Sequence, residues 1–226
     1  MLVAREQAQI ALAEKTRAED LLLEKKKTAG ILAVSPERNA FVSEAGYLVD
    51  SRSNSPIAQL TTQEINAVQF SPDGRKIVLG AGPIISVFDR SGALLKPFSI
   101  DGIVASIRFS PDGKQIAVVS VDGEAELWTL EGQLLRKFVA RVPIRVAAFS
   151  PDKSHLVTGL ETGDINVWDL DTGLEIIRFR GLDPTPPNLL GFSSDNQQML
   201  AGYQGGRIAI WDLATRKMST LLAFTP

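Results

Sequence analysis

The sequence predicts an all-β protein built from about five repeats of roughly 40 residues, each a four-stranded sheet, with one α-helix in front of them. Three observations support this fold class. A tight-turn motif recurs at nearly constant spacing, a strand that ends in an aromatic residue follows each copy, and short β-branched runs between Gly, Pro, Asp and Ser fill the intervals. Residues 1–29, in contrast, contain no Gly or Pro.

The composition of the N-terminal segment, residues 1–29, predicts the helix. It is rich in Ala, Leu, Glu and Lys, which are strong helix formers, and Gly30 follows as a stop signal. Its apolar positions recur at alternating steps of three and four, but Lys15 and Lys25 interrupt that seam. A solvated linker helix and a coiled-coil-like helix that binds a partner or another copy therefore both remain open.

The turn motif is Ser-Pro-Asp-Gly or a close variant, and a Phe precedes every copy. Pro presets the first central torsion angle of such a turn, and Asp and Gly tolerate the torsions that follow. We therefore assign Asp73, Asp112 and Asp152 to turns. The copies are spaced by 39, 40 and 43 residues and begin at Ser71, Ser110, Ser150 and Ser193.

A strand ending in an aromatic residue closes about 17 residues after each turn begins. All three tryptophans of the chain fall on this repeat position. The strand ends are Phe88-Asp89, Trp128-Thr129, Trp168-Asp169 and Trp211-Asp212. The same period predicts an additional first unit around Ser35-Pro36-Glu37, in which the motif is incomplete. The predicted units are 30–64, 65–103, 104–143, 144–186 and 187–226.

A Phe-Ser-Pro-Asp-Gly turn and a strand ending in Trp-Asp, repeated about every 40 residues, resemble WD repeats. The resemblance covers residues 30–226. It implies a β-propeller in which each unit is a four-stranded blade and the ring is a platform for protein partners. The repeats are most similar to those of bacterial WD-repeat proteins, where blades often follow a helical connector of a signalling, protease or nucleotidase module. Residues 1–29 would be that connector, and the blades a docking or sensor part.

Two departures from the family pattern carry expectations of their own. The family's relay of His, Asp and Trp is incomplete, because the only His is His155 and the Asp before the Trp position survives only as Asp122. Packing between sheets must then provide the stability. Five blades are also fewer than the usual seven, so the sequence leaves open a small ring, an open arc and a ring completed by another chain. We expect that the chain self-associates or is part of a longer architecture.

Composition excludes several functions. Lys plus Arg is 24 and Asp plus Glu is 26, so no strong field attracts nucleic acid. The longest apolar run is four residues, too short for a membrane span, and no secretory signal is present, so we expect a cytoplasmic protein. There is no Cys, and we find no catalytic, cofactor-binding or metal-binding pattern. We predict a non-enzymatic scaffold; the alternatives are a hydrolase-like propeller enzyme with its site at the channel mouth and a structural oligomeriser.

The resemblance also implies a docking face, formed by the turns between second and third strands and by the connections between blades. Its candidate partner-binding residues here are Asn66, Val121, Arg141, Arg145, Glu161, Asn188 and Gln204. Near them lies a basic cluster of Arg136, Lys137, Arg141, Arg145, Arg178 and Arg180. Solvated charges explain this cluster, or it docks an acidic peptide. The Pro-rich insertion 181–188 is either a blade connector or a stiff recognition loop.

Overall fold

The computed structural model describes residues 30–182 and 184–223 and confirms the all-β fold. These residues contain twenty strands in five four-stranded antiparallel sheets. Every sheet is a meander in which neighbours in sequence are neighbours in space. We number the sheets 1 to 5 along the chain. The predicted N-terminal helix, 1–29, lies outside the described residues.

The strands of the first three sheets alternate with short turns. Sheet 1 contains β1 (Ile31–Val34), β2 (Ala40–Ser43), β3 (Tyr47–Asp50) and β4 (Pro56–Gln59). Sheet 2 contains β5 (Ala67–Phe70), β6 (Lys76–Ala81), β7 (Ile84–Asp89) and β8 (Leu94–Ser99). Sheet 3 contains β9 (Val104–Phe109), β10 (Gln115–Ser120), β11 (Ala125–Thr129) and β12 (Leu134–Phe138).

The last two sheets repeat this plan. Sheet 4 contains β13 (Ile144–Phe149), β14 (His155–Leu160), β15 (Ile165–Asp169) and β16 (Glu175–Phe179). Sheet 5 contains β17 (Leu189–Phe192), β18 (Gln198–Tyr203), β19 (Arg207–Asp212) and β20 (Met218–Ala223), with a 3-10 turn at Gln204–Gly206.

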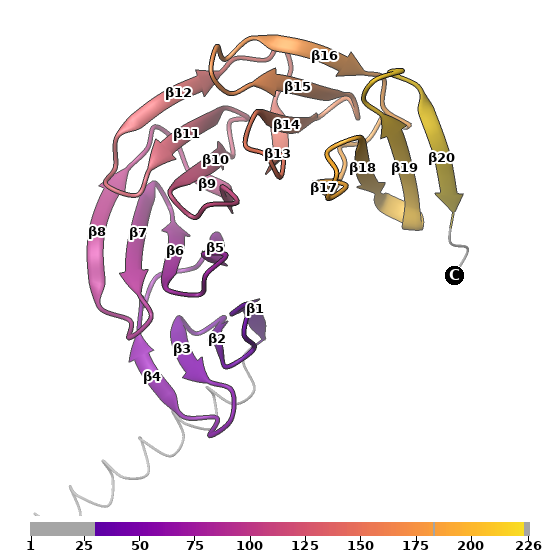
Figure 1. The fold of residues 1–226 in the computed structure, drawn as a ribbon. Helices are drawn as coiled ribbons and strands as arrows, with labels where there is room; N and C mark the ends of the chain where they lie inside the picture. Colours follow the sequence, from indigo (N-terminus) through magenta and orange to yellow (C-terminus); the bar gives the residue numbers. More distant parts are fainter. Residues whose placement is uncertain (1–29, 183, 224–226) are drawn as a thin grey trace, which may run out of the picture.

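The five sheets stand side by side around a common centre, with the first strand of each innermost and the fourth outermost (Figure 1). The circle does not close, because a gap separates sheet 1 from sheet 5 (Figure 1). Of the arrangements that the sequence left open, the small closed ring is therefore wrong for this chain, whereas an open arc and a ring completed by another chain both agree with the gap. Because each sheet is a meander, the turns between second and third strands and the connections between sheets share one face, which we call the upper face.

Apolar side chains between neighbouring sheets form the core. At three of the four junctions an aromatic residue of the outermost strand meets the tryptophan of the next sheet. The ring centroids are 5.3 Å apart for Phe98 and Trp128, 5.7 Å for Phe138 and Trp168, and 5.9 Å for Phe179 and Trp211. Such a pair contributes about 0.5 to 1.5 kcal/mol beyond the burial of its area. Repetition of one aromatic pair thus joins sheets 2 to 5.

Two tryptophans also make hydrogen bonds that the sequence analysis did not foresee. Trp128 Nε1 donates to Glu126 Oε2 at 2.9 Å, and Trp168 Nε1 donates to Thr158 Oγ1 at 2.7 Å. Asp122, the one residue in the family's relay position, is exposed. The expectation that packing alone replaces the relay was therefore too simple, because two buried neighbours satisfy the indole N–H groups.

The Ser-Pro-Asp-Gly motifs form the turns between first and second strands. In sheet 2 the Ser71 hydroxyl donates to Asp73 Oδ1 at 2.6 Å, and the Lys76 N–H donates back to Ser71 Oγ at 2.9 Å. Asp112 and Asp152 accept the same bond from Ser110 and Ser150. After the third strand, Asp89, Asp169 and Asp212 each accept N–H groups of the following turn.

Candidate protein-docking site

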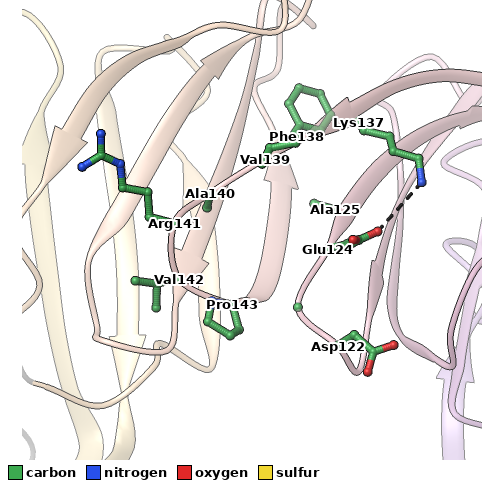
Figure 2. Close-up of a pocket in the computed structure, with 11 residues that line it drawn as sticks. Asp122, Glu124, Ala125, Lys137, Phe138, Val139, Ala140, Arg141, Val142 and Pro143 are labelled. Atoms are coloured by element: carbon green, nitrogen blue, oxygen red, sulfur yellow. Dashed lines mark ion pairs between the residues drawn. The ribbon is translucent and has the colours of Figure 1, made fainter.

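A pocket of about 230 Å³ opens between sheets 3 and 4 (Figure 2). One wall is the turn between β10 and β11, which includes Asp122 and Glu124. The other is the end of β12 and the connection to β13, residues 139–143. Both segments belong to the upper face, so the pocket lies on the face where the sequence analysis placed partner binding.

The local sequence explains why turn and connection meet here. Gly123 has φ +88°, and a Cβ at this position would lie 2.6 Å from Pro143 Cα, so no side chain fits. The Gly123 carbonyl accepts the N–H of Ile144 at 2.8 Å, and the Pro143 carbonyl accepts the N–H of Glu161 at 2.9 Å. These bonds fix the pocket to both sheets.

The pocket offers apolar surface to a partner. Phe138 forms its inner part and is buried, whereas Val142 is half-buried. Val139 is 82% exposed, the highest exposure among the large apolar side chains that the structure describes. Isolated exposed apolar residues are common, but this one stands beside a cavity with an apolar lining. The arrangement suits the insertion of an apolar side chain.

The charges around the pocket separate into two sides (Figure 2). On the β11 side, Lys137 Nζ lies 2.7 Å from Glu126 Oε1 and 3.9 Å from Glu124 Oε2, and the hydrogen bond with Glu126 raises the pKa of Lys137. On the connection side stands Arg141, which is exposed. Within the described residues the Arg141 guanidinium has no hydrogen bond or ion pair. Of the two cations that line the pocket, Lys137 and Arg141, Arg141 is therefore the one available to a ligand.

Three of the predicted partner-binding residues meet in one cluster beside the pocket. Arg145 forms an ion pair with Glu161 and donates to the carbonyl oxygen of Val121 at 3.1 Å. The Arg145 guanidinium thus links sheet 3 to the second turn of sheet 4. Its charge is compensated inside the molecule.

The other predicted positions are placed differently. The side chain of Asn66 accepts the N–H of Gly82 at 2.6 Å, and the Asn188 N–H donates to the carbonyl of Gly202 at 2.8 Å. Asn66 therefore stabilises the turn between β6 and β7, and Asn188 extends the backbone ladder between β17 and β18. Gln204 lies in the 3-10 turn and is exposed. Of the seven candidates, Arg141 is the one that lines the pocket between sheets 3 and 4.

Three of the six cations in the predicted basic cluster, Lys137, Arg145 and Arg178, are paired with carboxylates within the molecule. Arg136 donates to the backbone carbonyls of Asp171 and Thr172, and Arg178 lies 3.4 Å from Glu175. Lys137 and Arg145 have the carboxylate partners described above. Among the described residues of this cluster, Arg141 and Arg180 are thus the exposed cations without an ion pair or hydrogen bond, and Arg141 is the one that lines the pocket.

Sequence reasoning missed the exposure of Val139 and the carboxylates that surround Lys137. The available signal was the connection itself, where Val-Ala-Arg-Val-Pro at 139–143 is more apolar than the Ile-Asp-Gly-Ile connection at 100–103. Across the described residues no group of three or more His, Cys, Asp and Glu side chains is arranged to hold a metal ion. In that same part of the chain no helix has the length and apolar character that crossing a membrane requires.

Comparison with known proteins supports the repeat assignment. Residues 96–129 and 132–169 match the family model "WD domain, G-beta repeat". These segments include strands of sheets 2, 3 and 4. The two matched segments follow the same 40-residue period that the turn motifs show.

Curated relatives share about half of this chain. Target of rapamycin complex subunit LST8 from Bos taurus is 30% identical over 116 residues, which are 48% of this chain and 36% of the relative. Small ribosomal subunit protein RACK1 from Caenorhabditis elegans is 32% identical over 121 residues, 51% of this chain and 37% of the relative. WD repeat, SAM and U-box domain-containing protein 1 from Danio rerio is 35% identical over 113 residues, 47% of this chain and 23% of the relative.

The match thus spans little more than a third of the first relatives' length. These relatives are animal proteins, so they do not support the predicted likeness to bacterial WD-repeat proteins. The repeated four-stranded sheets agree with the match of residues 96–129 and 132–169 to the WD domain, G-beta repeat model.

Proposed function

We propose that this chain is a non-catalytic scaffold that binds a protein partner through its upper face, with the pocket between sheets 3 and 4 as the principal contact. The observation that carries the proposal is Val139, which is 82% exposed beside an apolar pocket. Two relatives bear names that place them in larger assemblies, a complex subunit and a ribosomal subunit protein. Those names describe the relatives, and for this chain they support the proposed class of function.

The pocket also suggests the chemistry of the partner. An apolar side chain inserted next to Val139 and Phe138 would gain about 1.5 to 3 kcal/mol from burial. A carboxylate beside it would meet Arg141, and a charge-assisted hydrogen bond of this kind is stronger than a neutral one. The predicted acidic peptide is therefore refined to a segment with one apolar anchor and an acidic residue next to it.

The test compares proteins captured by the full chain and by two variants, Val139→Asp and Arg141→Glu. Both variants should lose the same partner, with at least a tenfold reduction in the captured amount. Lys114→Glu is the matched control, because it reverses the charge of an exposed residue in the turn between β9 and β10, at the opposite end of the sheet. If neither pocket variant alters capture relative to this control, the pocket is not the docking site.

Three further predictions from the sequence remain proposals. They are a cytoplasmic location, a docking or sensor role in a signalling architecture of bacterial type, and the absence of catalysis. An oligomerising role for residues 1–29 concerns a segment outside the described residues. The capture experiment also bears on the signalling role, because the identity of the retained partner assigns the assembly.

A further inference from the structure

The inner surface of the arc, formed by the innermost strands β1, β5 and β9 of sheets 1 to 3, holds two adjoining cavities (Figure 1). Their volumes are about 260 and 460 Å³, and both are lined by Leu32, Val68 and Arg108. The larger one lies within the range of about 300 to 1,000 Å³ that is usual for small-molecule sites. We call the two cavities together the inner site.

Arg108 is the only charged residue among those that line either cavity. It is half-buried, and burial lowers the pKa of its guanidinium. Arg108 Nη1 donates to the carbonyl oxygen of Ile107 at 2.9 Å, and within the described residues the guanidinium has no other hydrogen bond or ion pair. A guanidinium has five N–H donors. A cation that has lost part of its hydration without a carboxylate partner is destabilised, and a bound anion would remove that cost.

The repeat shows that a sheet does not need a cation at this position. Arg108 pairs with the third residue of the second strand of its sheet, and the residues that do so in the other sheets are Ala33, Gln69, Ala148 and Gly191. The Gln69 side-chain oxygen accepts the N–H of Phe109 at 2.8 Å, so it serves a contact between sheets. Alanine and glycine have no polar side chain. The charge of Arg108 is therefore specific to sheet 3.

Two further donors share the smaller cavity with Arg108. Ser106 lies two residues before Arg108 on β9, so both side chains are on the same face of the strand. In the part of the chain that the structure describes, the Ser106 hydroxyl has no hydrogen bond. The Asn66 side-chain oxygen accepts the N–H of Gly82 at 2.6 Å, which leaves its NH₂ group to donate. No Asp or Glu is among the residues that line either cavity. This donor set suits an anion.

The larger cavity continues from Arg108 over apolar surface. Leu32, Val34 and Val68 line it, together with the buried Phe70 and Phe109. One guanidinium balances a single negative charge, so the site suits a carboxylate better than a phosphate group, which carries about 1.5 to 2 negative charges. The two oxygens of a carboxylate also match the two parallel N–H groups of a guanidinium.

We propose that the inner site binds a small monocarboxylic acid, with its carboxylate on Arg108, Ser106 and Asn66 and its apolar body along the larger cavity. This binding is additional to the docking of a protein on the upper face, since none of the three residues lines the pocket between sheets 3 and 4. The inner site belongs to sheets 1 to 3, so it does not depend on what stands in the gap between sheets 1 and 5.

Titration calorimetry of the full chain with sodium hexanoate tests the proposal. One charged contact and a short apolar chain should give a dissociation constant of about 1 to 10 mM. Arg108→Gln should weaken binding at least tenfold. Arg180→Gln is the matched control, because Arg180 is exposed in sheet 4 and has no ion pair or hydrogen bond within the described residues. The inner site is refuted if hexanoate fails to bind below about 50 mM, or if Arg108→Gln binds it as the parent chain does.

Two other probes test the chemistry of the ligand. Hexan-1-ol has the same apolar chain without the charge and should bind at least ten times more weakly than hexanoate. Inorganic phosphate has the charge without the chain and should also bind at least ten times more weakly. Equal binding of the alcohol contradicts a role for the guanidinium, and equal binding of phosphate contradicts the assignment of a monocarboxylic acid.

A second variant tests the site if Arg108→Gln does not fold. Ser106→Asp places a carboxylate on the same face of β9 as Arg108, where it should pair with the guanidinium and exclude the ligand. We expect hexanoate binding to weaken at least tenfold and the midpoint of thermal unfolding to rise by about 1 to 4 °C. Ser106→Asn has nearly the same size without the charge and should bind hexanoate within about threefold of the parent chain. Unchanged binding in Ser106→Asp overturns the proposal.

Discussion

The apolar faces of sheets 4 and 5 that carry the equivalent residues Val157 and Leu200 present nearly the same chemistry in two different environments. Val157 and Ile165 of sheet 4 are fully buried, whereas Leu200 and Ile208 of sheet 5 are half-buried. The residue types at these repeat positions do not distinguish the two sheets. The burial of these side chains depends on whether a neighbouring sheet packs against them. The repeat places apolar residues at these positions both in sheet 4, which has such a neighbour, and in sheet 5.

The largest expected effect separates Val157→Asp from Leu200→Asp. An unpaired carboxylate in the junction of sheets 4 and 5 should cost about 3 to 5 kcal/mol of unfolding free energy, because it loses its hydration without a partner. At Leu200 water still reaches the side chain, and the cost should be about 1 kcal/mol or less. Urea unfolding followed by tryptophan fluorescence at about 1 μM measures both.

Equal losses in these two variants would show that the face of sheet 5 is as well covered as that of sheet 4. Val139→Asp serves as the control for a carboxylate added at an exposed apolar position. Its unfolding free energy should stay within about 0.5 kcal/mol of the parent value.

An intermediate effect is expected from a glycine that sheets 4 and 5 share at one repeat position, Gly159 and Gly202. Gly159→Ala adds a methyl group against the ring of Pro187, which has little freedom to move, so it should destabilise the chain by about 1 to 3 kcal/mol. Gly202→Ala meets only an ordinary contact with Leu189 at 3.4 Å. It should be neutral or stabilising by up to about 1 kcal/mol, since alanine loses less backbone entropy than glycine on folding. Thermal unfolding of both variants is the measurement, and destabilisation by Gly202→Ala would indicate an occupied face.

Much of the fold could be predicted from the sequence because its signals are local. The turn of Ser71, Pro72, Asp73 and Gly74 uses hydrogen bonds within a few residues, so the motif and its period located the sheets. The aromatic end of the third strand was equally visible, since Trp128, Trp168 and Trp211 share one repeat position.

The docking site was harder to predict because its contacts join distant residues. Arg145 contacts Glu161 and Val121, which are 16 and 24 residues away, so its apparent positive charge is compensated by the fold. The exposure of Val139 depends on where the turn at Gly123 meets the connection at Pro143. The open arc was one of three alternatives, because the number of repeats does not determine closure.

The smallest expected effect concerns the turn aspartates at the lower end of the sheets. Burial raises the pKa of Asp112, but hydrogen bonds from Lys153 of the next sheet and from Ser110 outweigh it and lower the value from 3.8 to about 2. Asp195 holds the same turn position in sheet 5, and its pKa is lowered by the Ser193 hydroxyl and the Gln197 N–H, both within its own turn. Asp112 thus has a contact across the junction to the next sheet, whereas Asp195 of sheet 5 has contacts only within its own turn.

Because the folded pKa of Asp112 lies below the unfolded one, its contribution to stability is present above about pH 4 and is lost as the pH falls toward 2. Lys153→Met should therefore flatten the loss of stability between pH 4 and 2, by about 0.2 to 1 kcal/mol, since the lysine is partly exposed. Urea unfolding at pH 6, 4, 3 and 2 measures the change. Asp195→Asn, which removes a carboxylate with local contacts only, leaves the Lys153 contribution intact. If Lys153→Met has the same pH profile as the parent chain, the contact between Lys153 and Asp112 does not couple sheets 3 and 4 in solution.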